Sequence, residues 1–187
     1  MRRQNLEQKF SCRSVSAIIK RCRAERYRLY SCGRQDDLYF AAIKGRLKIR
    51  RTGGAAELIY YLRRDSKEPR VSDYFRLPLD SGRDEMAHVL AAAMGSIGSV
   101  RKERTVYYNK RVRINIDRVD GLGDFVELEA ECREGEKGEA LRLLEATKTA
   151  LGLANGRAIP DSYIDLISRK VPVRPAKSKG RGLSRKK

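Results

Sequence analysis

The sequence has one histidine, no tryptophan and no Cys-x-x-Cys pair. The only histidine is His88, and the four cysteines (Cys12, Cys22, Cys32 and Cys132) are far apart along the chain. A zinc site of the finger or ribbon type is therefore not expected. Because His88 falls within a predicted helix, mechanisms that require a histidine base are also disfavoured.

Long apolar runs are absent as well. The chain contains neither a signal peptide nor a run of about 18 apolar residues, the length that a membrane-spanning helix needs. We therefore predict a cytoplasmic protein with reduced thiols and no contact with a membrane.

Charge is abundant, and most of the excess lies at the two ends. The chain has 187 residues and a formal net charge of +18. Residues 1–34 carry ten Lys/Arg and two acids, whereas residues 171–187 carry seven Lys/Arg and no acid.

With 41% hydrophobic residues, the length suits one well-buried domain. We predict one domain over residues 1–170 and a basic disordered tail over residues 171–187, which is rich in Pro, Lys, Arg, Ser and Gly.

Hydrophobic periodicity predicts an α+β fold. Helical spacing indicates helices from an N-cap at Ser14 to about Tyr30, over 81–95, over 136–151, and after Pro160. Alternating or β-rich runs indicate strands at 5–10, 38–40, 46–51, 57–64, 70–79, 99–108, 111–119 and 124–132. This order lacks the strict alternation of a parallel sheet. It favours an eight-stranded antiparallel β-barrel with helices packed outside.

Several strands carry a charged face opposite an apolar one. Lys48 and Arg50 alternate with apolar residues, as do Glu127 and Glu129. For a single strand, such a face usually points to solvent. Here at least five strands carry one, and cations are segregated from carboxylates.

If the apolar faces pack under helices, the charged faces converge inside a barrel. Burying many like charges is costly without a counter-ion. Arg and Lys suit phosphate oxygens, and carboxylates suit Mg²⁺ or Mn²⁺. The inferred ligand is a di- or triphosphate together with a divalent metal.

The same residues carry a family resemblance. N-x-E-x-K at 5–9, RLKIRR at 46–51, ELIYY at 57–61, K-x-R at 102–104 and RVRINIDRVDGLGDFVELE at 111–129 resemble the CYTH family. So do R-x-S-x-Y at 70–74 and SYIDLI at 162–167. This family of triphosphate tunnel metalloenzymes includes class IV adenylate cyclases and thiamine triphosphatases. The resemblance implies an eight-stranded tunnel that binds a triphosphate through inward cations and a divalent metal through carboxylates.

Specific site residues follow from the resemblance. It implies metal ligation by Glu7, Glu127 and Glu129, with Asp117 as a helper, and it assigns Glu127 and Glu129 to catalysis. The triphosphate contacts that it implies are Lys9, Lys48, Arg50, Arg63, Arg70, Lys102, Arg104 and Arg113.

One position departs from the family pattern. The family motif is E-x-E-x-K, but the first carboxylate is here the amide of Asn5. An amide oxygen can ligate a hard cation but supplies no negative charge, so metal affinity should be lower. Asn5 therefore favours a non-catalytic binder of polyphosphate or nucleotide as one alternative.

The implied substrate is ATP, thiamine triphosphate or tripolyphosphate. A cyclase would release pyrophosphate as the ribose 3′-OH attacks the α-phosphorus, whereas a hydrolase would direct water to the terminal phosphorus. GLGDF at 121–125 resembles the cyclase branch slightly more.

Nucleic-acid binding through the basic tail and the first helix is a third hypothesis, less favoured because no aromatic residues interleave the tail. The sequence is compatible with a homodimer but does not determine the oligomeric state.

Overall fold

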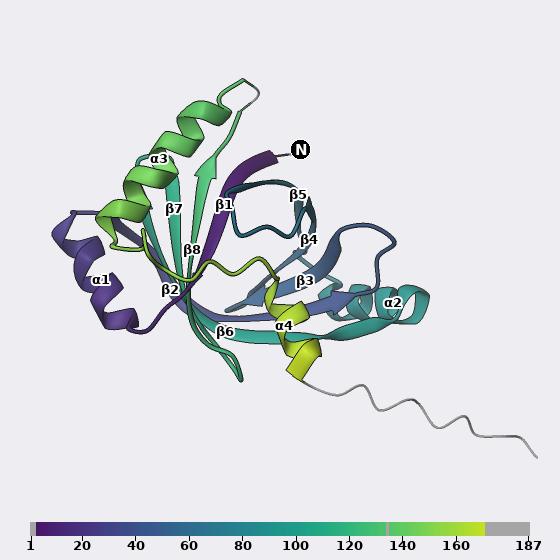
Figure 1. Ribbon diagram of the computed structural model, residues 1–187. Helices are drawn as coiled ribbons and strands as arrows, with labels where there is room; N and C mark the ends of the chain where they lie inside the picture. Colours follow the sequence, from purple (N-terminus) through teal and green to yellow (C-terminus); the bar gives the residue numbers. More distant parts are fainter. Residues whose placement is uncertain (1–2, 134, 171–187) are drawn as a thin grey trace, which may run out of the picture.

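The eight strands close into an antiparallel barrel, as the alternating patterns predict. We describe a computed structural model of residues 3–133 and 135–170. The strands are β1 (Arg3–Ser11), β2 (Arg28–Phe40), β3 (Arg46–Thr52), β4 (Ala55–Arg63), β5 (Arg70–Pro78), β6 (Ser96–Asn109), β7 (Val112–Val119) and β8 (Gly123–Glu131). Their order around the barrel is β1-β5-β4-β3-β2-β6-β7-β8. The first strand closes the barrel because it pairs with both β5 and β8 (Figure 1).

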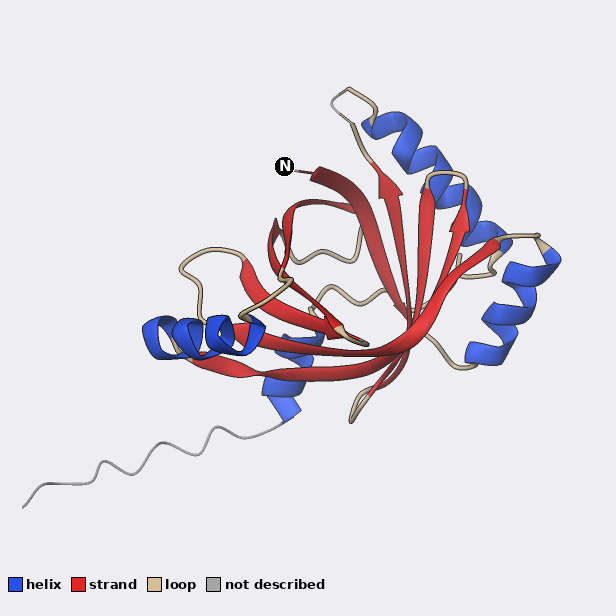
Figure 2. Cartoon of the chain, turned by 180° about the vertical axis from the view of Figure 1, so that it is seen from behind, coloured by secondary structure: helices blue, strands red, loops and turns tan. Residues whose placement is uncertain are grey.

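The helices lie outside the barrel. They are α1 (Val15–Ala24), α2 (Arg83–Met94), α3 (Lys137–Ala150) and α4 (Tyr163–Lys170). Helices α1 and α3 lie on the same side of the molecule, and α2 lies at the opposite end (Figure 2). No helix in the described part of the chain has both the length and the apolar character needed to cross a membrane.

The main core lies between the barrel and the helices α1 and α3. Leu6, Ile114 and Leu128, which belong to β1, β7 and β8, pack in one buried cluster with Ile18 of α1 and Leu144 of α3. In each of these strands the apolar side chains alternate with polar ones. Burial of the apolar set under the helices therefore turns the polar set toward the barrel interior.

The predicted end of the first helix was wrong. Ser14 does cap α1, because its hydroxyl accepts a hydrogen bond from the backbone N–H of Ala17. The helix ends at Ala24, however, and not near Tyr30. Arg26 has a φ of 55°, a left-handed conformation that a helix does not continue through.

The strand predicted at 38–40 is only the end of the thirteen-residue strand β2. The side chains at 28–34 are exposed, so they give no apolar alternation that would reveal a strand. Backbone pairing with β6 defines this part of β2 instead. The predicted disordered tail at 171–187 lies outside the described residues.

Candidate functional site

The barrel encloses a cavity of about 120 Å³ lined by charged side chains from all eight strands. The lining Lys and Arg residues outnumber the Asp and Glu residues by eight to four. The cations are Lys9, Lys48, Arg50, Arg63, Arg76, Lys102, Arg104 and Arg113, and the acids are Glu7, Asp37, Glu127 and Glu129. Such an excess of partly desolvated positive charge favours a polyanionic ligand.

Three of the four acids come from the neighbouring strands β1 and β8. The register places Glu7 opposite Glu129 and Lys9 opposite Glu127. Asn115 of β7 donates a hydrogen bond to Glu129, with Nδ2 and Oε1 2.9 Å apart. The carboxylate group therefore depends on pairing between segments more than 100 residues apart.

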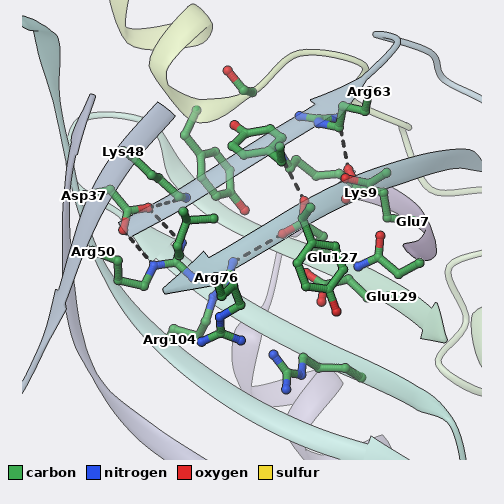
Figure 3. A pocket seen from close by; sticks show the side chains of 18 of the residues that line it. Glu7, Lys9, Asp37, Lys48, Arg50, Arg63, Arg76, Arg104, Glu127 and Glu129 are labelled. Carbon is green, nitrogen blue, oxygen red and sulfur yellow. Dashed lines mark hydrogen bonds and ion pairs between the residues drawn. The ribbon is translucent and has the colours of Figure 1, made fainter. Parts of the chain in front are cut away.

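Cations already contact two of these acids (Figure 3). Glu7 forms ion pairs with Arg63 at 3.1 Å and with Arg70 at 3.2 Å. Glu127 lies 3.6 Å from the Lys9 ammonium and 3.2 Å from the Arg104 guanidinium. Any ligand cation or phosphate must compete with these internal pairs.

The carboxylates have different pKa shifts. Burial raises the pKa of Glu7 and of Glu129, and the negative charge of Glu127 raises both further. Burial also opposes ionisation of Glu127, but Lys9 and Arg104 lower the pKa of Glu127 to about 2. Glu127 is therefore ionised throughout the neutral range, and an additional cation would stabilise the ionised forms of Glu7 and Glu129.

The donor chemistry at β1 and β8 fits a hard divalent cation. Glu7, Glu127 and Glu129 provide carboxylate oxygens, and the buried Oδ1 atom of Asn5 has no hydrogen-bond partner among the residues that the structure describes. Within residues 3–133 and 135–170, no three His, Cys, Asp or Glu side chains are yet close enough together to hold a metal ion. A bound cation would have to draw these carboxylates away from their internal ion pairs.

The cationic part of the cavity is organised by Asp37. Its carboxylate accepts hydrogen bonds from Lys48 Nζ at 2.8 Å and from Lys102 Nζ at 2.9 Å. Arg50 donates to both carboxylate oxygens, through Nε at 2.7 Å and Nη2 at 2.8 Å. The sequence analysis missed Asp37. The one available signal was that Asp37 and Tyr39 alternate with the apolar Leu38 and Phe40.

Residues at the start of α4 close part of the cavity wall. Tyr163 donates a hydrogen bond from its hydroxyl to Asp117 Oδ2 at 2.8 Å, and its ring lies 4.0 Å below the Lys9 ammonium. Lys9 also donates to the backbone carbonyl of Asp161 at 3.1 Å. The segment around residues 161–163 therefore holds Lys9 in place within the cavity.

Comparison with known proteins identifies the family. The model of the CYTH domain matches residues 15–163, most of the chain. This chain belongs to the CYTH domain family. No curated protein matches it significantly. The family match begins at α1, so the place of β1 in the CYTH barrel rests on its pairing with β5 and β8.

Solved structures share the CYTH fold with this chain at low identity. A protein from Pyrococcus horikoshii OT3 is similar with a TM-score of 0.76 at 20% identity, covering 87% of this chain and 98% of its own. A Vibrio parahaemolyticus protein named as a candidate adenylate cyclase has a TM-score of 0.69 at 13% identity, with coverages of 89% and 98%. A candidate adenylyl cyclase from Hippeastrum, described as having a dominant triphosphatase activity, has a TM-score of 0.62 at 17% identity, with coverages of 91% and 98%.

The CYTH barrel brings most of the predicted site residues together. Seven of the eight predicted phosphate contacts line the cavity; Arg70 does not, and it bonds instead to Glu7 and to the Ser66 carbonyl. Asp117, predicted as a metal helper, also lies outside the lining and pairs with Arg104. Besides Asp37, the sequence analysis missed Arg76, which reaches the cavity from β5.

Proposed function

We propose that this CYTH protein is a divalent-metal-dependent enzyme that binds a triphosphate inside the barrel and hydrolyses it. The observation that carries the proposal is the buried cavity with eight cations and four acids, three of the acids being grouped on the paired strands β1 and β8. The dominant triphosphatase activity named for the Hippeastrum neighbour supports hydrolysis as the reaction.

Eight of the twelve charged side chains that line the cavity have a role in this proposal. Lys48, Arg50, Lys102, Arg104 and Arg113 would donate hydrogen bonds to phosphate oxygens and neutralise their charge. Glu7, Glu127 and Glu129 would hold Mg²⁺ or Mn²⁺, with the Asn5 amide oxygen beside them. The bound cation would supply Lewis-acid stabilisation of charge on the phosphoryl oxygens. Glu127 and Glu129 would orient the water that attacks the terminal phosphorus.

Cyclisation of ATP is the second candidate. It is favoured by the GLGDF segment at residues 121–125, which resembles the cyclase branch. The lining residues recognise the triphosphate that both reactions share, so they do not distinguish the two. A non-catalytic triphosphate-binding protein is the third outcome, and it is favoured by Asn5.

One assay separates these functions. Purified protein is incubated with ATP, thiamine triphosphate or tripolyphosphate, each with Mg²⁺ or Mn²⁺. We expect orthophosphate release. Cyclic AMP and pyrophosphate from ATP would instead support the cyclase. Tight triphosphate binding without turnover would support the non-catalytic protein and contradict the enzyme hypothesis.

Asn5→Glu is expected to raise the affinity for Mn²⁺ about tenfold, because a carboxylate replaces a neutral oxygen next to the proposed metal ligands. Isothermal titration of Mn²⁺ without triphosphate measures the effect. Asn5→Gln is the matched control, since it adds the same length without charge and should leave the affinity near that of the wild type. Equal affinities for all three proteins would place Asn5 outside the metal site.

Triphosphate affinity is expected to fall as the pH rises above 8. Burial, together with the charge of Arg50, lowers the pKa of Lys102 to about 8 despite the opposing effect of Asp37. A bound triphosphate favours the charged form of Lys102. Above the pKa of Lys102, the protein must therefore take up a proton on this lysine when the triphosphate binds. The predicted loss is up to about tenfold per pH unit between pH 8 and about 10.

Tripolyphosphate titrations at several pH values, without metal, test this pH dependence. Lys102→Arg is the control, because a guanidinium stays protonated over the whole range. The decline should be shallower in this variant. An identical pH profile in both proteins would show that another group controls the titration.

A further inference from the structure

Asp37 differs from the other acids that line the cavity. Glu7, Glu127 and Glu129 belong to β1 and β8, whereas Asp37 lies on β2 among the cations of β3 and β6. Its side chain is 1% exposed, and its two oxygens accept four hydrogen bonds from three cations. Figure 3 shows Lys48 and Arg50 both directed at this carboxylate.

The donors around Asp37 are the ones that would bind a phosphate group. Arg50 presents Nε and Nη2 side by side to the carboxylate, the arrangement by which arginine also binds phosphate. Two lysine ammonium groups complete the set on the same oxygen, Oδ2. A phosphate oxygen placed between Lys48 and Lys102 would therefore compete with this oxygen.

We propose that Asp37 is an internal counter-anion, which occupies a phosphate subsite formed by Lys48, Arg50 and Lys102 and is displaced by a phosphate group of the bound triphosphate. The inference rests on the proposed function, because it assumes that a triphosphate enters the barrel. Asp37 thereby acts as a positioning residue: it aligns three cations in the free protein and weakens their hold on phosphate. Its return to these cations favours the release of phosphate products.

Two electrostatic effects make Asp37 suited to this role. The three buried cations of the subsite, Lys48, Arg50 and Lys102, repel one another. Burial, together with the charge of Arg50, lowers the pKa of Lys48 well below its usual range. The charge of Asp37 opposes this shift and keeps the subsite cationic. The same charge repels an incoming anion, and this repulsion is stronger than in bulk water because the effective dielectric constant at a buried site is only about 20.

Asp37→Asn tests the proposal, because it removes the charge with little change in shape. Tripolyphosphate binding is measured by isothermal titration at pH 6 with EDTA, so that neither metal nor catalysis contributes. We expect the variant to bind at least about tenfold more tightly than the wild type. The gain should shrink as the pH rises, since the lysines of the variant lose their protons at a lower pH than those of the wild type. If Asp37 had only a structural role, Asp37→Asn would not bind tripolyphosphate more tightly than the wild type.

Asp36→Asn is the matched control. It makes the same change of charge at the adjacent residue, but Asp36 pairs with Arg34 and Arg101 outside the cavity, and its side chain is 47% exposed. This variant should bind tripolyphosphate within about twofold of the wild type, because exposed charges are screened. An equal gain in both variants would assign the effect to net charge and overturn the inference.

The remaining outcomes separate this inference from the proposed function. If the wild type binds tripolyphosphate and Asp37→Asn binds equally or more weakly, the inference fails while the proposed function stands. If neither protein binds, both fail. A crystal structure of the wild type with tripolyphosphate provides a test that does not depend on the variant folding. It should show a phosphate oxygen bonded to Lys48 and Lys102 in place of Asp37, and four intact Asp37 bonds with no phosphate beside them would contradict the proposal.

Discussion

Glu127→Gln is expected to reduce metal-dependent triphosphate turnover by at least about 100-fold. The pKa of Glu127 is lowered to about 2, so the wild-type side chain carries a negative charge at every pH at which the protein would be assayed. Glutamine has nearly the same shape but lacks this charge. The substitution therefore removes an anionic ligand of the proposed metal site while preserving the packing of β8.

The same change should affect binding in the opposite direction. Without metal, the cavity of Glu127→Gln is more positive than that of the wild type, so tripolyphosphate should bind as tightly or more tightly. Turnover and metal-free binding, measured on the same preparation, distinguish loss of the metal site from loss of the fold. A misfolded variant would lose both.

Glu131→Gln is the matched control for this experiment. Glu131 belongs to the same strand but is exposed and does not line the cavity. The metal-dependent turnover of Glu131→Gln should equal that of the wild type. If Glu127→Gln retained full turnover at saturating metal and substrate, Glu127 would have no place in the catalytic site.

Arg104→Met is expected to lower the free energy of unfolding by about 3–5 kcal/mol. Arg104 donates to Asp117 through Nε at 2.6 Å and through Nη2 at 2.5 Å, and Asp117 is completely buried. Removal of the guanidinium leaves a buried carboxylate that keeps its hydrogen bond from the Tyr163 hydroxyl but loses its paired charge, and an uncompensated buried charge strongly destabilises a fold.

Urea denaturation of single and double variants tests this expectation. The double variant Arg104→Met, Asp117→Leu should recover most of the lost stability, because it replaces the whole buried pair with apolar groups. Arg118→Met is the control on the next strand. Its pair with Asp124 is exposed, with 64% of the Arg118 side chain accessible, so the loss should stay below about 1 kcal/mol. A loss that small for Arg104→Met would show that Asp117 does not depend on the charge of Arg104.

The inward faces of the barrel could largely be predicted from short segments. Lys48 and Arg50, or Glu127 and Glu129, are separated by two positions, and their neighbours are apolar. Because successive side chains of a strand point to opposite faces, burial of one set under a helix places the other set inside. This rule worked for β3 and β8 without knowledge of their partners. It failed for β2, where residues 28–34 are exposed and show no alternation.

The partner of each charge could not be predicted in this way. Arg70 shares its strand face with Ser72, which lines the cavity, yet its guanidinium turns to Glu7 and the Ser66 carbonyl. Asp117 likewise precedes the GLG turn in a predicted strand, but Arg104 and Tyr163 bind its carboxylate behind the cavity lining. Both positions depend on side chains contributed by other strands or by α4.

Alternation and composition were enough to indicate a cationic barrel interior and carboxylates grouped on one strand, and the family resemblance was enough to reveal the departure at Asn5. These properties depend on neighbouring positions along one strand, where the backbone geometry is nearly constant. The pairing of Glu7 with Arg63, the four bonds to Asp37 and the contact of Lys9 with Tyr163 depend on the barrel closing in one register. Shifting a strand by one residue would turn its side chains to the other face, so only the closed structure determines which charges meet.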